Sequence, residues 1–393
     1  MSLQSGCAGL RVMLVLGTRP EAIKMLPVLD ALRARPGFAP FLLSTGQHRE
    51  MLDQTLAAFG AAADQDLGVM TPGQPPALLF SRILLGVTEV LGREKPDLVL
   101  VHGDTTTAMA AALAAFYARV PIGHVEAGMR SCDLARPFPE ELNRVVVDAM
   151  ATLRFAPTEA AAANLRREYG ARGHVLVTGN TGIDALMGMA MRLATDRALS
   201  ARVEAMLPPL DPVRRLLVVT AHRRESFGRG LDALCDALAR IAVRGDVEIV
   251  WPLHRNPAAR GAALRRLRSV PGIHLVEPLD YAGMVWLMCR ATLLLTDSGG
   301  LQEEGPALGK PVLVLRDVTE RPEAVATGVA KLVGTDPRAI RGEVARLLDD
   351  GVAYAAMARH VFPYGDGTAA ARIVDAIAAW AGSHRVTAAR SAA

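Results

Sequence analysis

Acidic side chains follow apolar segments in the first half of the sequence. Asp104 and Glu126 each come shortly after an apolar stretch, and Glu140 lies in the next polar segment. Neighbouring carboxylates raise one another's pKa, so that one can donate a proton while another accepts one near neutral pH. These three residues are therefore candidates for acid and base chemistry. Structural alternatives are that Asp104 is the N-cap of a helix and that Glu141 is a solvent-facing acid at a helix start.

Basic residues at other segment ends suit an anionic ligand. Arg19 and Lys24 lie in the first turns of the helix expected after the first apolar stretch. His222 stands beside two arginines, and His254 follows another apolar stretch. Each of these side chains can donate a hydrogen bond to a diphosphate oxygen. The alternative is a set of ordinary turns with solvated cations, and His254 taken singly favours a structural role.

A glycine-rich turn in the second half predicts a phosphate-binding helix. Ser298, Gly299 and Gly300 open this helix, and its free backbone amides can hold an anion. One turn later, Glu303 or Glu304 is placed to reach ribose hydroxyls. The loop after the next expected strand adds Arg321 as a further contact.

These loops must be positioned by repeated βα units. Short apolar segments bounded by turn residues alternate with amphipathic segments, which is typical of parallel sheets. The first series of predicted strands is 11–16, 41–44, 97–101, 121–125, 153–156 and 174–177. The second series is 215–219, 247–251, 273–276, 292–295 and 312–315. The prediction is an α/β fold of two Rossmann-like, doubly wound domains facing a central cleft. Ligands of such sheets bind beyond the carboxyl ends of the strands, so we expect the loops that follow the strands to line this cleft.

The domain boundaries follow from the same pattern. Residues 1–180 form the N-terminal Rossmann-like domain with the candidate carboxylates, and 181–365 form the second domain. Residues 366–393 are expected to form a C-terminal helix that packs back on the N-terminal domain, followed by a frayed tail.

Composition excludes several other classes of protein. The chain has 393 residues, 51% of them hydrophobic and 21% charged, which favours two folded domains over disorder. The net charge is +4, but the basic residues are scattered and aromatics make up only 4%, so no nucleic-acid platform is predicted. The four cysteines lack zinc-ligand spacing. With no membrane-length apolar run and no signal-like start, we expect a cytoplasmic protein without a metal.

Taken together, the segments resemble the non-hydrolysing UDP-N-acetylglucosamine 2-epimerases over about residues 12–367. The resemblance is carried by GTRPEAIKMLPV, GQHREMLDQ, HGDTTTAMA, GHVEAGMRS, PFPEELNR, TGNTGIDAL, TAHRRESFGRG, TDSGGLQEE and ERPEAV. It implies the glycosyltransferase-B fold and a cytoplasmic isomerase that acts as a homodimer. The implied ligands are UDP-N-acetylglucosamine and UDP, with no cofactor.

The resemblance also implies roles for individual residues. The acid and base candidates are Asp104, Glu126 and Glu140, with His222 as a further catalytic residue. The implied UDP-sugar contacts are Arg19, Lys24, His222, Ser298, Gly299, Gly300, Glu304 and Arg321. A second, activating UDP-N-acetylglucosamine is implied at Gln47, Glu50, Arg223 and His254, with Glu50 standing where some relatives have Gln. Leu279 and Met284 stand where relatives have Gln and Phe beside the uracil, which alters the expected pocket.

The implied reaction is reversible epimerisation at C2 by elimination of UDP and its re-addition, supplying a precursor of a surface polysaccharide. The alternatives are a hydrolysing epimerase, an epimerase of a modified UDP-sugar, a glycosyltransferase of the same fold, and a nucleotide-sugar sensor without turnover.

Overall fold

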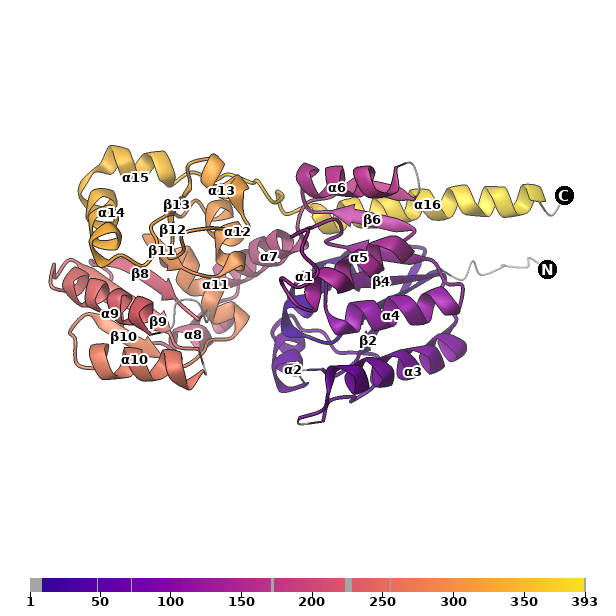
Figure 1. The fold of residues 1–393 in the computed structure, drawn as a ribbon, viewed down its shortest axis with the longest axis horizontal. Helices are drawn as coiled ribbons and strands as arrows, with labels where there is room; N and C mark the ends of the chain where they lie inside the picture. Colours follow the sequence, from indigo (N-terminus) through magenta and orange to yellow (C-terminus); the bar gives the residue numbers. More distant parts are fainter. Residues whose placement is uncertain are drawn as a thin grey trace. The chain divides into compact units, whose positions relative to one another are not determined.

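The computed structural model describes residues 9–47, 49–71, 73–170, 173–222, 228–254 and 256–391. At 49–51, 229, 257–259 and 384–391 only the backbone is described. The chain forms two compact units (Figure 1): residues 1–185 with 364–393, and residues 186–363. The predicted junction at 180/181 coincides with the start of α7 (Thr181–Thr195), whereas the units divide within this helix, after Ala185.

The first unit is built on a seven-stranded parallel sheet with the order β3-β2-β1-β4-β5-β6-β7. Its strands are β1 (Leu10–Leu16), β2 (Phe38–Ser44), β3 (Gln65–Asp66), β4 (Leu98–His102), β5 (Ile122–Val125), β6 (Leu153–Ala156) and β7 (His174–Val177). Its helices before α7 are α1 (Arg19–Ala34), α2 (Arg49–Ala58), α3 (Pro76–Glu94), α4 (Thr106–Tyr117), α5 (Glu140–Met150) and α6 (Glu159–Tyr169).

Helices cover both faces of this sheet. The central strand β4 is buried along its whole length, as expected of an apolar parallel strand with helices on either side. One face packs against α1 and the C-terminal helix α16 (Ala369–Ser391), which contributes Ile373, Ile377 and Trp380 to the core. The other face packs against α3 and α4. The helical backbone of α16 continues to Ser391.

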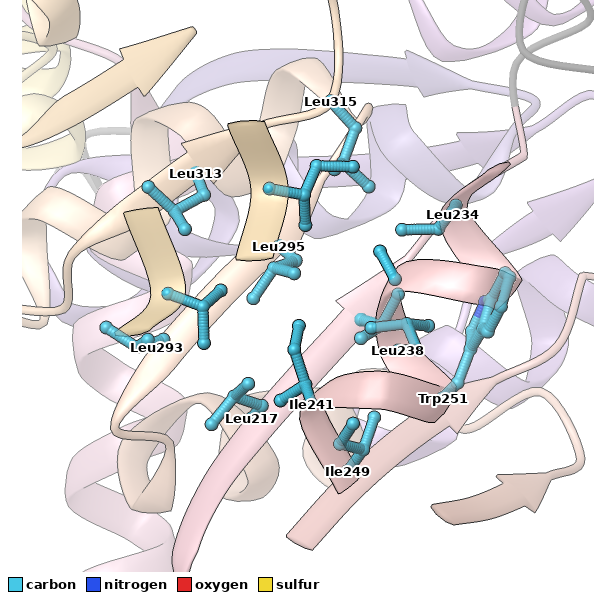
Figure 2. Packing of buried hydrophobic residues seen from close by; sticks show 14 of the residues in the cluster. Leu217, Leu234, Leu238, Ile241, Ile249, Trp251, Leu293, Leu295, Leu313 and Leu315 are labelled. Atoms are coloured by element: carbon cyan, nitrogen blue, oxygen red, sulfur yellow. The ribbon is translucent and has the colours of Figure 1, made fainter. Parts of the chain in front are cut away.

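The second unit is built on a six-stranded parallel sheet with the order β10-β9-β8-β11-β12-β13. Its strands are β8 (Arg215–Thr220), β9 (Val247–Pro252), β10 (Ile273–Val276), β11 (Leu293–Thr296), β12 (Val312–Val314) and β13 (Ala330–Leu332). Its helices are α8 (Arg197–Glu204), α9 (Arg229–Ala242), α10 (Pro257–Leu267), α11 (Tyr281–Arg290), α12 (Gly299–Ala307), α13 (Pro322–Ala326), α14 (Pro337–Asp349) and α15 (Gly351–Met357). Figure 2 shows Leu217, Ile249 and Leu295 of the sheet meeting Leu238 and Ile241 of α9 in its core.

The two sheets confirm the predicted α/β class with two Rossmann-like domains, and each predicted strand overlaps an observed one. The strands β3 and β13 were not predicted, because two or three residues at a sheet edge leave no apolar run to recognise. In both sheets the strand order reverses between two central strands, β1 and β4 in the first unit and β8 and β11 in the second. Loops that follow such a pair splay apart and leave room for a ligand.

Within the described part of the chain, no helix is both long enough and apolar enough to cross a membrane. The same residues contain no group of three or more His, Cys, Asp or Glu side chains arranged to hold a metal ion.

Candidate active site

Glu21 ties together the two loops at the reversal point of the first sheet. Its buried carboxylate accepts hydrogen bonds from the Gly17 amide (3.1 Å) and the Thr18 amide (2.8 Å) after β1. It also accepts one from the Thr105 hydroxyl (2.6 Å), which lies after β4. Burial raises the pKa of Glu21 despite these donors. Sequence reasoning missed this residue, although the Thr18-x-x-Glu21 spacing is that of a capping box.

Glu126 lies in a largely buried, positively charged setting. Its carboxylate forms an ion pair with Lys24, and the Oε2 atom is 3.7 Å from Nε2 of His102. Burial acts to raise the pKa of Glu126, but the charges of Lys24 and His102 outweigh it and hold the pKa well below its ordinary value. The Glu126 carboxylate is therefore ionised at neutral pH.

The backbone of Glu126 is strained. Its φ of 67° lies in the left-handed region that non-glycine residues rarely adopt. Such strain persists only where surrounding contacts fix it, and it concentrates at functional sites. A Cβ atom added at Gly103 would lie 3.7 Å from Oε1 of Glu126, so the loops after β4 and β5 are adjacent at this point.

Asp104 is not the N-cap of α4, because that position belongs to Thr105, whose hydroxyl accepts from the Ala108 amide at 3.0 Å. The Asp104 side chain is half-buried and forms an ion pair with Arg144 of α5. The Nδ2 atom of Asn143 donates to the Asp104 carbonyl oxygen at 2.8 Å. The Asp104 carboxylate thus does not cap α4 and is instead held by a residue of α5.

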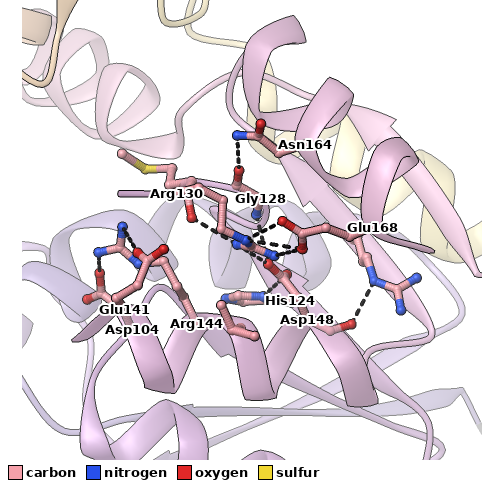
Figure 3. Close-up of polar contacts among 12 residues, drawn as sticks. Asp104, His124, Gly128, Arg130, Glu141, Arg144, Asp148, Asn164 and Glu168 are labelled. Carbon is pink, nitrogen blue, oxygen red and sulfur yellow. Dashed lines mark hydrogen bonds and ion pairs between the residues drawn. The ribbon is translucent and has the colours of Figure 1, made fainter. Parts of the chain in front are cut away.

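Glu140 and Glu141 begin α5 but differ in their surroundings. Glu140 is half-buried, and its side chain forms no hydrogen bond or ion pair with the described residues. Glu141 is only 1% exposed, so the alternative of a solvent-facing acid was wrong. Its carboxylate accepts from the amides of Ser131 and Cys132 at 3.0 Å, and Arg144 contacts it at 3.3 Å. Figure 3 shows Arg144 reaching both Asp104 and Glu141.

A buried network supports the loop that carries Asp104 (Figure 3). The Nδ1 atom of His124 is 2.6 Å from Asp148, and its Nε2 atom is 2.8 Å from the carbonyl oxygen of Gly103. Arg130 contacts Asp148 at 2.8 Å and pairs with Glu168 at 2.6 Å. The network thus joins the ends of β4 and β5 to α5 and α6.

The other predicted contacts of the first unit are only partly described. Arg19 is exposed at the start of α1. Gln47 is half-buried and accepts a hydrogen bond from the Thr107 hydroxyl at 3.0 Å. Glu50 lies in α2, but its side chain is outside the described residues.

At the reversal point of the second sheet, His222 lies beside Asp297. The His222 amide donates to Oδ2 of Asp297 at 2.8 Å, and Nδ1 of its ring is 3.3 Å from Oδ1. The ring of His254 stacks on that of His222, with centroids 5.6 Å apart. The structure thus brings together His222, predicted to be catalytic, and His254, predicted to contact the activating second UDP-N-acetylglucosamine. Arg223 lies outside the described residues.

The N-terminus of α12 opens directly after Asp297. Ser298 is the N-cap, but its side chain does not cap the helix. Among the described residues, a Cβ atom added at Gly300 would have only the Ser298 Oγ atom within 4 Å, at 3.9 Å, so the space beside this glycine is open to them. With Gly299 at the first helical position, the amides of this turn remain available to an anion.

The two glutamates of α12 have different partners. Glu303 is buried and forms an ion pair with Arg321, which makes it the poorer candidate for a ribose contact. Glu304 is half-buried and lies near the phenol of Tyr281. Burial raises the pKa of Tyr281 well above its ordinary value, and the Glu304 charge adds to this rise. In the loop before α11, Leu279 is half-buried, as is Met284 within the helix.

Comparison with known proteins decides the family. The sequence model of the UDP-N-acetylglucosamine 2-epimerases matches residues 30–378. The chain is 50% identical over 369 residues to UDP-N-acetylglucosamine 2-epimerase of Escherichia coli K12, covering 94% of this chain and 98% of that protein. The chain belongs to the UDP-N-acetylglucosamine 2-epimerase family.

Two solved structures share its fold. The 2-epimerase of Neisseria meningitidis, solved with UDP-GlcNAc, superimposes with a TM-score of 0.86 and 44% identity, covering 93% of this chain and 99% of that one. S. aureus MnaA, solved with UDP, gives a TM-score of 0.83 and 40% identity, covering 95% and 97%. In this 2-epimerase, sequence reasoning missed Arg144 and Asp297 as partners of candidate residues. Asp297 stands in the TDSGG segment that was already singled out, but its pairing with a residue 75 positions away leaves no local signal.

Proposed function

We propose that this 2-epimerase interconverts UDP-N-acetylglucosamine and UDP-N-acetylmannosamine without releasing the free sugar. The largely buried Glu126 carboxylate, kept ionised beside Lys24, is the observation that carries the proposal. A C2 hydrogen without an adjacent carbonyl leaves only if the bond from C1 to the diphosphate oxygen breaks with it. The reaction is therefore an anti elimination that needs a base at C2 and a site for the departing anion.

The proposed step balances as follows. A carboxylate takes the proton from C2, the C–H electrons form the C1=C2 double bond of 2-acetamidoglucal, and the C1–O bond breaks to release UDP. A second group then gives a proton to the opposite face of C2 while the UDP oxygen re-forms its bond to C1. We assign proton transfer to Asp104 and Glu126, with Glu140 as a further acid, base or positioning group. No cofactor takes part in these steps.

Groups of the second unit suit the leaving diphosphate. The open first turn of α12 from Ser298 to Gly300 offers amides to its oxygens, and His222 adds a side-chain donor. Arg19, Lys24, Glu304 and Arg321 are assigned to the remaining contacts with the UDP-sugar. We assign Gln47, Glu50, Arg223 and His254 to an activating second UDP-N-acetylglucosamine, and we propose a homodimer that supplies a surface-polysaccharide precursor.

The experiment is to incubate the purified protein with UDP-N-acetylglucosamine in heavy water and to follow the sugar protons by NMR. We expect intact UDP-N-acetylmannosamine with deuterium at C2. In Asp104→Asn and Glu126→Gln, conversion is expected to fall by 100-fold or more, on the order of the contribution of an acid or base.

Other results would favour the alternatives. Free N-acetylmannosamine as the first product would indicate a hydrolysing epimerase. Conversion only of an oxidised or diacetamido UDP-sugar would indicate a modified substrate. Binding without exchange or conversion would point to a glycosyltransferase that requires an acceptor or to a sensor.

A further inference from the structure

We propose that Asp297 is a positioning residue that fixes the tautomer and charge of His222. The proposal rests on the role of His222 beside the departing diphosphate, and it identifies the group through which that role is set. Asp297 itself is fully buried, with 0% of its surface exposed, so it acts through the histidine.

The two residues are placed side by side by adjacent parallel strands. Thr220 at the end of β8 pairs in register with Thr296 at the end of β11, and their hydroxyls are 2.6 Å apart. The Asp297 amide donates to the Thr220 carbonyl oxygen at 3.1 Å, which continues the ladder past both strand ends. Because this pairing is part of the sheet, the position of Asp297 relative to His222 is fixed by the core of the second unit.

The two oxygens of Asp297 hold different parts of His222. Oδ2 accepts from the backbone amide at 2.8 Å, and Oδ1 faces Nδ1 of the ring at 3.3 Å. The pair lies within ion-pair distance, and because a carboxylate accepts but does not donate hydrogen bonds, it favours a ring proton on Nδ1 over a lone pair there. The second ring nitrogen, Nε2, is then directed away from Asp297. An acidic residue paired with a histidine in this way orients the imidazole for transfer of charge or a proton.

The charge of the His222 ring depends on the same contact with Asp297. A carboxylate beside an imidazole favours the protonated ring, and an imidazolium donates from Nε2 to an anionic oxygen. Among the groups that face His222 are Asp297, after β11, and the stacked ring of His254, after β9. A charge on His254 opposes one on His222, whereas the buried Asp297 supports it. Asp297 thus prepares His222 to stabilise the diphosphate as it leaves C1.

The test is Asp297→Asn, which keeps an oxygen that can accept from the His222 amide but removes the negative charge. The matched control is Asp336→Asn in the same unit, since Asp336 caps α14 and asparagine caps equally well. Two readouts do not depend on turnover: the ring nitrogens of His222 in ¹⁵N NMR spectra, and the affinity for UDP between pH 6 and 8 by calorimetry.

We expect the wild type to carry a proton on Nδ1 of His222 at pH 7, and Asp297→Asn to lose that preference. The variant should bind UDP about tenfold more weakly at pH 6 and with less dependence on pH, and its kcat should fall about tenfold or more with a smaller change in KM. The control should match the wild type in all of these.

The outcomes separate this proposal from the proposed function. An unprotonated Nδ1 in the wild type would overturn the positioning role, and this measurement needs no variant. Wild-type UDP affinity and kcat in a folded Asp297→Asn would overturn it as well. If instead the wild type fails to convert UDP-N-acetylglucosamine while Asp297→Asn still alters the ring and UDP binding, the proposed function fails and the positioning role stands.

Discussion

At the scale of single residues, the candidate site depends on which charges are neighbours. Glu126 is ionised because Lys24 and His102 overcome the effect of burial. Asp104 pairs with Arg144 and does not cap α4, because Thr105 does the capping. Neither fact is a property of one residue type. Each depends on a partner elsewhere in the chain.

The ion pair of Glu126 leads to a prediction about pH. In Lys24→Met the lysine charge no longer offsets the effect of burial, so the pKa of Glu126 rises and the acid limb of the kcat/KM profile moves to higher pH. We expect conversion to fall roughly 10- to 100-fold at pH 6 and to recover in part towards pH 9.

The matched control is Lys331→Met, which removes another lysine–glutamate pair, with Glu343 in the second unit. Its pH profile should follow the wild type. An unchanged acid limb in Lys24→Met would show that Lys24 does not keep Glu126 ionised.

At the scale of elements, the loops of the first unit are held by the network around Asp148. This carboxylate joins β5 to α5 through His124 and reaches Arg130 in the loop that follows. Such contacts are long-range in sequence and exist only when the sheet has formed. Breaking one partner leaves the other charges buried and uncompensated.

Asp148→Asn is therefore expected to lower the free energy of unfolding by about 3 to 5 kcal/mol at pH 7. Burial acts to raise the pKa of Asp148, but His124 and Arg130 hold it below its ordinary value. A depressed carboxyl pKa stabilises the fold above the pKa of the unfolded chain, near 3.9, and this contribution is lost as the pH falls through the folded value. The deficit of Asp148→Asn should thus shrink below about pH 4.

Urea denaturation at pH 7 and pH 3.5 measures this difference. The control is Asp366→Asn, which removes an exposed partner of Arg372 in the same unit and should cost about 1 kcal/mol or less. Equal losses in the two variants, or a deficit independent of pH, would contradict a stabilising buried network.

At the scale of the whole molecule, the C-terminal segment belongs to the first unit although it follows the second in sequence. Ile373, Ile377 and Trp380 of α16 pack in the same core as α1 and the first sheet. The last helix of the chain therefore completes the core of the first unit.

Truncation after Pro363 is expected to destabilise the first unit and to leave the second intact. Loss of α16 exposes apolar surface on α1. It therefore lowers the free energy of unfolding of the first unit, since removal of even one large core side chain costs about 2 to 5 kcal/mol. Hydrogen–deuterium exchange should accelerate in α1 and β1 and stay unchanged in β8 and β11. Ile377→Ala should give a smaller change in the same elements, and uniform exchange across both units would contradict the division.

The sequence by itself determined the fold class, the central strands and the loops that carry the candidate residues, because apolar periodicity and turn residues are local signals. Its motifs also indicated the family. Only the tertiary structure decided that Glu141 is buried, that Arg144 holds Asp104 and that Asp297 faces His222. These pairings join residues on different elements, and their burial and charge are set by parallel strands brought into register, which no local pattern of residues records.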